Sequence, residues 1–405
     1  MINPELILPG GDIERTKIAF QFGADAVYVG LNEYSLRKAE VRFSLDEIKE
    51  AISYAHRINK RLFVTFNILA HNKDLSKLKS EMLKVASFKP DAFIIADPGI
   101  VSLSQQLAPE IPIHLSTQAN TINIEGVKFW QKQGVKRIVL ARELSLDEIN
   151  EIHAAVPSIE LEIFVQGAMC VSYSGRCLLS NYMTGREANL GNCSQPCRWD
   201  YNMYIEEKMR PGQYYPIYEE SDGTFVMSSK DLRLIKYLPE IIDAGVTGLK
   251  VEGRNKSEYY LVTTASTYRR ALELIKKHNY TLKDKNSLES ELEKLNYRGY
   301  TTGFLFGKAK TGEISKKRTA TKSWDYVGIV CDKNNTILVK NKLKVKDKIE
   351  VITPDGVRSD VILDICDEKS KNNKLLEINP GSEDQKAVVT LTRIYPINSI
   401  LRKKL

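Results

Sequence analysis

Short apolar runs alternate with amphipathic stretches of helical period through the first 255 residues. This alternation predicts strands separated by helices, because buried strands are short and apolar whereas surface helices repeat apolar residues every three to four positions. The expected strands are Glu5–Pro9, Asp25–Gly30, Arg61–Asn67, Asp91–Asp97, Pro112–Thr117, Lys136–Arg142, Glu160–Gln166 and Gly248–Gly253. Repeated strand–helix units of this kind predict an α/β fold, a (β/α)8 TIM-like barrel.

Two of the helices carry a clear start signal. The stretches Ser44–Asn59 and Ser145–His153 each begin with Ser and have Glu three residues later, at Glu47 and Glu148, which is the capping-box pattern. A doubly wound open sheet is the structural alternative to the barrel. It is the weaker interpretation because no G-x-G-x-x-G follows the first strand.

The last quarter of the chain has a different pattern. From Trp324 onward, short strand-like runs are separated by turn signals such as the Pro-Asp-Gly at Pro354, and six of them predict a small antiparallel β-barrel. The glycine-rich, basic segment Arg298–Glu313 is expected to be an exposed linker. We therefore expect a barrel domain over residues 1–307 and a linker with a β-barrel domain over 308–405.

Charge is distributed unevenly between these two parts. Residues 308–405 contain 21 Lys and Arg against 13 Asp and Glu, whereas residues 1–307 contain 38 of each kind, so the net charge of +8 lies entirely in the last quarter. Such asymmetry is typical of a module that faces a polyanion such as nucleic acid. A solvated basic surface without a partner explains it equally well.

Composition places the protein among ordinary globular chains. It is 42% hydrophobic and 27% charged, and no run approaches the roughly 18 apolar residues of a membrane helix. The N-terminal residues lack the basic region and apolar core of a secretion signal, so a cytoplasmic protein is expected. In that compartment, six cysteines indicate a metal or redox site rather than a disulfide framework.

Four cysteines gather in an insertion, residues 168–223, that interrupts the barrel rhythm. They are Cys170, Cys177, Cys193 and Cys197, with the spacing C-x6-C-x15-C-x3-C. An iron–sulfur cluster suits four such thiolates. Zinc usually requires paired C-x2–4-C knuckles, and only the last two cysteines approach that spacing. Disulfides or unbound thiols stay open as a third interpretation.

Hydrolytic motifs are not found in the sequence. There is no H-E-x-x-H and no G-x-S-x-G, and of the five histidines only His114 lies on an expected barrel strand. A satisfied core histidine is the simpler interpretation of that residue. These residues therefore give no independent support for a protease.

The segment around the first two cysteines resembles a known family. The run from Glu162 to Ser180, with Gly167-Ala168-Met169-Cys170 at its centre, is similar to the signature of the peptidase U32 (collagenase-like) family. Further blocks that look like those of this family are GADAVYVGL (23–31), FVTFNIL (63–69), IADPGI (95–100), IHLSTQAN (113–120), VLARELSLDEI (139–149), SSKDL (228–232) and LKVEGRNKS (249–257).

The resemblance implies a barrel protein that holds a 4Fe–4S cluster on the four cysteines of the insertion. It also implies oxygen-independent hydroxylation of tRNA, of ribosomal RNA or of a ubiquinone precursor, with prephenate as the oxygen donor. The expected arrangement of one barrel followed by one small β-domain most resembles that of the family branch that forms 5-hydroxyuridine at the tRNA wobble position. In one respect the chain departs from many relatives, since Gln166 stands where they have histidine, and glutamine cannot transfer a proton.

The preferred hypothesis is therefore a tRNA-modifying enzyme, with a further protein of the same family as a partner to be considered. The residues expected to bind the anionic donor or substrate are Arg142, Arg176, Lys250 and Arg254. Glu252 and Asp231 are candidate acid–base groups, although ion pairing with those cations is the simpler role. The alternatives are a U32-type peptidase and a non-catalytic RNA-binding protein with a structural cluster.

Overall fold

The computed structural model describes most of the chain. It covers residues 3–31, 43–168, 177–186, 193–199, 204–206, 208–209, 211–212, 214–216, 230–253, 256–297, 299–307, 323–368, 374–381 and 385–405. By packing, the chain forms two compact units. The first contains residues 1–13, 25–255 and 297–321, and the second contains residues 14–24, 256–296 and 322–405.

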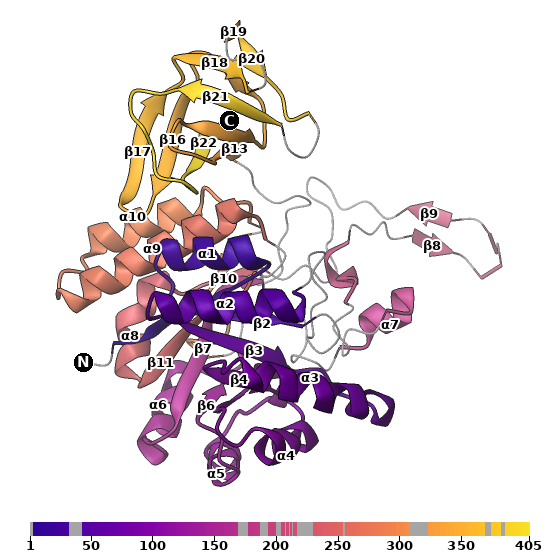
Figure 1. Cartoon of the computed structure of the whole chain (residues 1–405). Coiled ribbons are helices and arrows are strands. Elements are labelled where there is room, and N and C mark those ends of the chain that lie inside the picture. The colour runs from indigo at the N-terminus through magenta and orange to yellow at the C-terminus, as the bar shows by residue number, and fades with distance from the viewer. Residues whose placement is uncertain are drawn as a thin grey trace. The chain divides into compact units, whose positions relative to one another are not determined.

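The first unit is built on a closed barrel of eight parallel strands (Figure 1). These strands are β1 (Glu5–Pro9), β2 (Ala26–Gly30), β3 (Arg61–Phe66), β4 (Ala92–Ile95), β5 (Ile113–Leu115), β6 (Arg137–Val139), β7 (Glu160–Ala168) and β11 (Val246–Val251). The barrel closes because β11 pairs in parallel with both β7 and β1. The TIM-like barrel predicted from the alternating pattern is confirmed, and all eight expected strands lie within it.

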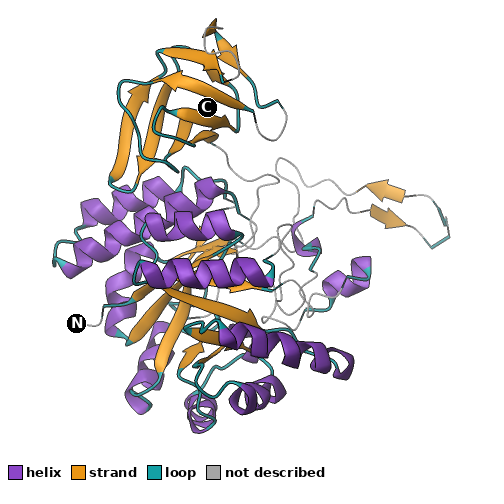
Figure 2. Cartoon of the chain, viewed as in Figure 1, coloured by secondary structure: helices purple, strands orange, loops and turns teal. Residues whose placement is uncertain are grey.

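Helices follow the strands in the chain and lie outside the barrel (Figure 2). Those of the first unit are α2 (Leu45–Arg57), α3 (Leu75–Ser87), α4 (Pro98–Leu107), α5 (Ile124–Lys132), α6 (Leu146–Ala155), α7 (Leu179–Thr184) and α8 (Leu238–Asp243). Both expected capping boxes are present, at Ser44 with Glu47 and at Ser145 with Glu148. No helix in the described ranges is long and apolar enough to cross a membrane.

Two further strands extend the barrel sheet at one edge. Strand β10 (Asp231–Arg233) runs antiparallel to the end of β7 and parallel to β12 (Tyr300–Thr301). Beyond β12, Leu305 is buried and its carbonyl accepts a hydrogen bond from the Leu146 amide at 2.9 Å. The expectation of an exposed linker from residue 298 is therefore wrong for residues 299–305, because strand pairing and an apolar anchor fix them. Within the insertion, β8 (Tyr204–Glu206) and β9 (Tyr214–Pro216) form a separate hairpin.

The barrel interior is divided into an apolar and a charged side. Registered partners in neighbouring strands point to the same face of a sheet, so following them around the barrel identifies the residues that face inward. On β1 to β4 these residues form an apolar cluster of Ile7, Ala26, Tyr28, Phe63, Ala92 and Ile94. On the other four strands the same face presents His114, Arg137, Glu162, Phe164 and Lys250. Apart from the N-terminal layer, where Glu5 on β1 and Arg61 on β3 also face inward, the charged residues of the barrel interior therefore lie on β5, β6, β7 and β11.

The second unit combines helices with an antiparallel sheet. The sheet has the strand order β17-β16-β22-β13-β14-β21-β18-β19. Its strands are β13 (Trp324–Val330), β14 (Thr336–Val339), β16 (Lys348–Thr353), β17 (Gly356–Val361), β18 (Asp364–Asp367), β19 (Lys374–Leu375), β21 (Lys386–Thr390) and β22 (Ile400–Lys404), with β15 (Leu343–Lys344) and β20 (Glu377–Ile378) paired beside it. The helices are α9 (Glu258–Lys276), α10 (Leu282–Leu292) and most of α1 (Ile13–Gln21).

A buried arginine joins the sheet of this unit to its helices. Arg402 on β22 is fully buried and donates to Glu350 on β16 at 2.9 Å. It also forms an ion pair with Glu291 on α10. The pattern of strands in the last quarter correctly predicted an antiparallel β-domain, whereas the expected closure into a barrel is not shown by the strand pairings of the described residues. The grouping of this sheet with α9 and α10 in one unit was not predicted.

Candidate active site in the barrel

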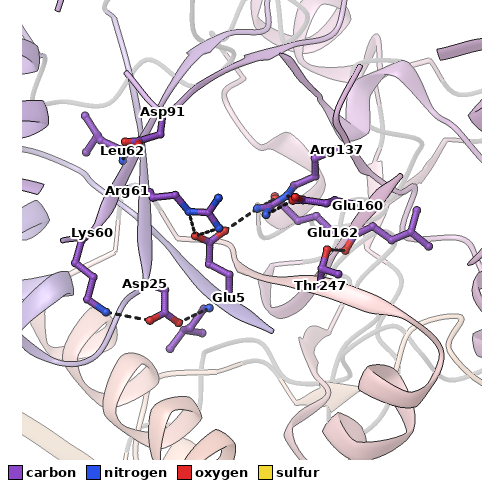
Figure 3. A network of polar contacts seen from close by, with 12 residues as sticks. Glu5, Asp25, Lys60, Arg61, Leu62, Asp91, Arg137, Glu160, Glu162 and Thr247 are labelled. Atoms are coloured by element: carbon purple, nitrogen blue, oxygen red, sulfur yellow. Dashed lines mark hydrogen bonds and ion pairs between the residues drawn. The ribbon is translucent and has the colours of Figure 1, made fainter. Parts of the chain in front are cut away.

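A network of ion pairs fills the N-terminal end of the barrel (Figure 3). Arg137, only 2% exposed, donates to Glu5 at 2.7 Å and to Glu160 at 2.7 Å. Arg61 donates to Glu5 from the opposite side. Glu5, Arg61, Arg137 and Glu160 are the first residues of their strands. Their position opposite the usual active-site end of such barrels assigns this network a structural role.

A second ion pair lies in the next layer of inward-facing residues toward the C-terminal end of the barrel. Lys250 donates to Glu162 at 2.5 Å, and the two side chains are 6% and 0% exposed. Burial alone would raise the pKa of Glu162, but the charges of Lys250 and Arg137 outweigh it and lower that pKa below its usual value. The Lys250 ammonium also lies 4.5 Å from the centre of the Tyr28 ring. Lys250 is thus an internal cation paired with a charged carboxylate.

His114 lies on the same inner face. It is buried and packs edge-on against Phe63, with 4.7 Å between the ring centres. Burial and the nearby charges of Arg137, Lys250 and Arg61 lower its pKa well below the usual value, so the imidazole is neutral. Its Nδ1 atom is buried without a hydrogen-bond partner among the described residues. Because burial and three nearby cations lower its pKa, this histidine does not readily accept a proton near neutral pH.

The C-terminal end of the barrel brings Arg142 and Glu252 together. Arg142 Nη2 lies 3.9 Å from Glu252 Oε2, and both side chains are less than 10% exposed. The guanidinium donates to the Ala168 carbonyl at 2.7 Å and lies 4.0 Å from the centre of the Phe164 ring. Two of the candidate residues are therefore held together at the end where barrel enzymes place their active sites.

Gly167 makes this arrangement sterically feasible. Its φ is +111°, and a Cβ atom there would lie 2.5 Å from the Glu252 carbonyl oxygen. The Glu252 amide donates to the Gln166 carbonyl at 2.9 Å, so the ends of β7 and β11 are drawn tightly together. The glycine in the Gln-Gly-Ala motif is thus required by the close approach of the strand that carries Glu252.

Asp231 faces the same side of the sheet as Gln166. In the antiparallel pairing of β10 with β7, Asp231 is the partner of Ala168 and Arg233 is the partner of Gln166. Since registered partners share a face, Asp231 and Arg233 lie on the face of β7 that carries Ala168 and Gln166, at the C-terminal end of that strand. Leu232 between them is buried on the other face. The structure therefore places Asp231 at the edge of the barrel mouth.

The described cysteines of the insertion lie in two segments that are hydrogen-bonded together. Cys177 precedes α7, Cys193 precedes the 3-10 turn η4 (Pro196–Arg198), and Cys197 lies within that turn. Ser194 bonds to both Ser180 and Thr184 of α7 at 3.0 Å.

Among the described residues, these three cysteines form no disulfide with one another. Within the described ranges, no three His, Cys, Asp or Glu side chains are grouped closely enough to hold a metal ion. Cys170, Arg176 and Arg254 lie outside the described residues.

Arg137, Glu160 and Glu162, which face the interior of the barrel, were not predicted as site residues from the sequence. Glu160 and Glu162 alternate with apolar residues in a strand that was expected to be buried, and this alternation is the signal that indicates inward-facing carboxylates. Arg137 carries the corresponding positive charge on the neighbouring strand. Lys250 and Glu252 were recognised, but their separate partners, Glu162 and Arg142, became evident only from the fold.

Comparison with known proteins places this geometry in context. The chain is 38% identical over 399 residues to the tRNA hydroxylation protein P of Escherichia coli, covering 88% of this chain and 87% of the relative. It is 45% identical over 303 residues to the protein of the same name from Helicobacter pylori, covering 74% and 71%. It is 36% identical over 316 residues to a 23S ribosomal RNA 5-hydroxycytidine synthase of Escherichia coli, covering 76% of this chain and 46% of that protein.

The family model described as peptidase family U32 matches residues 11–315, which contain all the barrel strands after β1, the Arg142–Glu252 pair and the cysteine-rich insertion. The protein therefore belongs to peptidase family U32.

Proposed function

We propose that this protein is a cytoplasmic enzyme that hydroxylates the wobble uridine of tRNA to 5-hydroxyuridine without molecular oxygen, using prephenate as the oxygen donor. The main support is its similarity to the tRNA hydroxylation protein P of Escherichia coli over 88% of this chain. The family model ends at residue 315, whereas the similarity to the Escherichia coli protein covers 88% of the chain. That similarity must therefore continue into the C-terminal β-domain. The similarity thus includes both the barrel and the basic domain.

Arg142 is the residue to which we assign binding of a donor carboxylate. Its guanidinium is oriented by the Ala168 carbonyl and the Phe164 ring. Glu252 lies 3.9 Å away, which is beyond hydrogen-bond distance, so an incoming carboxylate could share the guanidinium with it. We assign Glu252 the role of positioning Arg142, and Asp231 at the mouth the role of an acid–base group. Arg176 and Arg254 are proposed as further anion-binding residues.

Lys250 serves this site in a different way. Because Glu162 occupies its ammonium at 2.5 Å, we assign Lys250 an indirect role below the site rather than direct contact with the donor. Burial is the main cause that lowers the pKa of His114, and the positive charges of Arg137 and Lys250 lower it further.

We also propose that Cys170, Cys177, Cys193 and Cys197 hold a 4Fe–4S cluster, with zinc as the lesser alternative. The gathering of these four cysteines in one insertion, with the spacing C-x6-C-x15-C-x3-C, supports this assignment. When bound, the cluster would supply Lewis-acid or redox chemistry beside the barrel mouth. The hydrogen bonds of Ser194 to Ser180 and Thr184 would hold the cysteine segments in place.

The β-domain is proposed to bind the tRNA backbone. The segment from Leu343 to Ile349 presents the exposed Lys344, Lys346 and Lys348, with Asp347 between the last two. A row of cations of this kind contacts phosphates without reading sequence, which fits a domain that supplies affinity while the barrel selects the base.

The decisive experiment is nucleoside mass spectrometry of total tRNA from a strain that lacks the gene. We expect 5-hydroxyuridine and its derivatives to be lost, to return with the wild-type gene, and to stay at least about tenfold lower with Arg142→Gln, because that variant lacks the charge that binds the carboxylate. Lys128→Gln on α5 is the matched control, because the partly exposed Lys128 pairs with Glu125 on the same helix.

Other outcomes would point to the alternatives. If tRNA is unchanged and ribosomal RNA is altered, the substrate is ribosomal RNA, as in the name of the Escherichia coli relative. RNA binding without any change in nucleosides would indicate a non-catalytic RNA-binding protein. Cleavage of denatured protein that persists in the Arg142→Gln variant would support the peptidase that the family name describes.

A further inference from the structure

Three flat side chains are stacked at the edge of the barrel sheet. The rings of Tyr297 and Tyr300 are nearly parallel, with 8° between their planes and 4.4 Å between their centres. The guanidinium carbon of Arg233 lies 4.2 Å from the centre of the Tyr300 ring. Both tyrosines are partly exposed. We call these three residues the aromatic stack.

The backbone around the stack is specified locally. Gly299, between the two tyrosines, has a φ of +86°, which favours glycine and turns the chain so that the rings face one another. The side chain of Lys230 runs past this turn, since its Cγ lies 3.5 Å from where a Cβ of Gly299 would be. Lys230 thus adds a second cation beside the stack, which already contains Arg233.

The sheet register connects the stack to the proposed active site. Arg142 bonds to the carbonyl of Ala168, Ala168 is the registered partner of Asp231, and Asp231 is the registered partner of Tyr300. Registered partners share a face, so Tyr300 lies on the same side of the sheet as Asp231. Because β10 pairs with the C-terminal end of β7, the stack stands beside the barrel mouth, and strands β7 and β10 separate it from Arg142, which follows β6.

We propose that the aromatic stack binds an unpaired nucleobase next to the target uridine in the RNA substrate; this inference rests on the proposed function. Anticodon-loop bases are unpaired, and proteins bind such bases by stacking them on tyrosine rings and on guanidinium planes. A base stacked on Tyr297 would extend the existing column, and Lys230 and Arg233 lie where they can bind the adjoining phosphates. The target base would then enter the mouth while its neighbour is held at the edge.

A purely structural role for the stack predicts a different behaviour. The β10–β12 pairing and the buried Leu305 already fix this edge of the sheet. Removing one partly exposed ring would then change stability a little and leave RNA binding unaltered.

The test uses the full-length protein and a fluorescently labelled anticodon stem-loop that carries a uridine at the wobble position. We expect Tyr297→Ala to weaken binding about tenfold, as is typical for the loss of one stacking contact. Tyr297→Leu, which fills the space without a flat face, should weaken it similarly, whereas Tyr297→Phe should keep wild-type affinity. Phe129→Ala is the matched control, because Phe129 is a 52%-exposed aromatic residue on α5.

A second measurement separates stacking from a general loss of structure. Replacing the base beside the wobble uridine with 2-aminopurine should give fluorescence that is quenched on binding to the wild-type protein and to Tyr297→Phe, but not on binding to Tyr297→Leu. If the wild-type protein does not bind the stem-loop, the proposed function itself fails. If it binds and both Tyr297→Ala and Tyr297→Leu bind equally well with full quenching, the stacking site is overturned while the hydroxylase proposal stands.

Discussion

Lys250 and Glu162 form an ion pair of 2.5 Å inside the barrel, with side chains that are 6% and 0% exposed. A pair at this depth is costly to break, because removing one partner leaves the other charge buried and uncompensated. Arg137 approaches the same carboxylate at 3.3 Å, so Glu162 joins the upper ion pair to the network at the N-terminal end of the barrel. The two layers of charge therefore depend on one carboxylate.

The first prediction concerns this pair. Lys250→Met should destabilise the protein by about 3 to 5 kcal/mol, because Glu162 then loses its principal cation. The double variant with Glu162→Leu should lose less unfolding free energy than the two single variants added together, because neither charge of the pair is then left buried without the other. Urea unfolding of the four proteins of this double-mutant cycle measures the coupling, and strictly additive losses would show that the pair is not coupled.

The second prediction concerns pH. The pKa of His114 is lowered well below its usual value by burial and by the surrounding cations, so the folded protein does not bind the proton that the unfolded chain takes up. Stability from this residue is therefore fully present above the unfolded pKa, near 6.5, and falls as the pH drops below it.

Between pH 7.5 and 5.5 we expect the wild-type protein to lose about 1 kcal/mol more than His114→Phe, which keeps an aromatic ring against Phe63. Unfolding free energies at the two pH values measure this difference. Equal losses in both proteins would mean that His114 titrates alike in the folded and unfolded states.

The third prediction concerns Gly167. Gly167→Ala should destabilise the protein by more than about 2 kcal/mol, because the new Cβ would meet the Glu252 carbonyl and the residue would keep a positive φ. Gly185→Ala is the matched control. It also has a positive φ, of +67°, but no atom lies within 4 Å of its new methyl group. Thermal unfolding of both variants separates the backbone cost from the steric clash, and equal shifts would contradict the close approach of β11.

The fourth prediction concerns the cysteines of the insertion. Protein purified without air should contain iron and absorb in the visible range, and Cys197→Ser should lose most of both because a serine is a poor ligand for such clusters. Cys331→Ser, in the β-domain, should retain both, since burial raises the pKa of the Cys331 thiol and disfavours the thiolate that metals need. Iron analysis and absorption spectra of the two variants decide the point. Equal iron in both would exclude Cys197 as a ligand, and zinc in place of iron would identify the lesser alternative.

The sequence by itself determined the barrel, the capping boxes and the residues of the candidate site. These follow from local physics, because a strand or a helix start depends on residues only a few positions apart. Arg142, Lys250, Glu252 and Asp231 were recognised in the same way, from their places near the expected strand ends.

Tertiary structure decided which of these residues meet. Arg142 and Glu252 are 110 positions apart in the sequence, and closure of β11 between β7 and β1 brings them together. Closure also turns Lys250 toward Glu162. Separate pairing with β10 fixes Tyr300 and Thr301, which the sequence had assigned to an exposed linker. Such partners depend on register and on the closure of the sheet, which are properties of the whole barrel and leave no local trace in the chain.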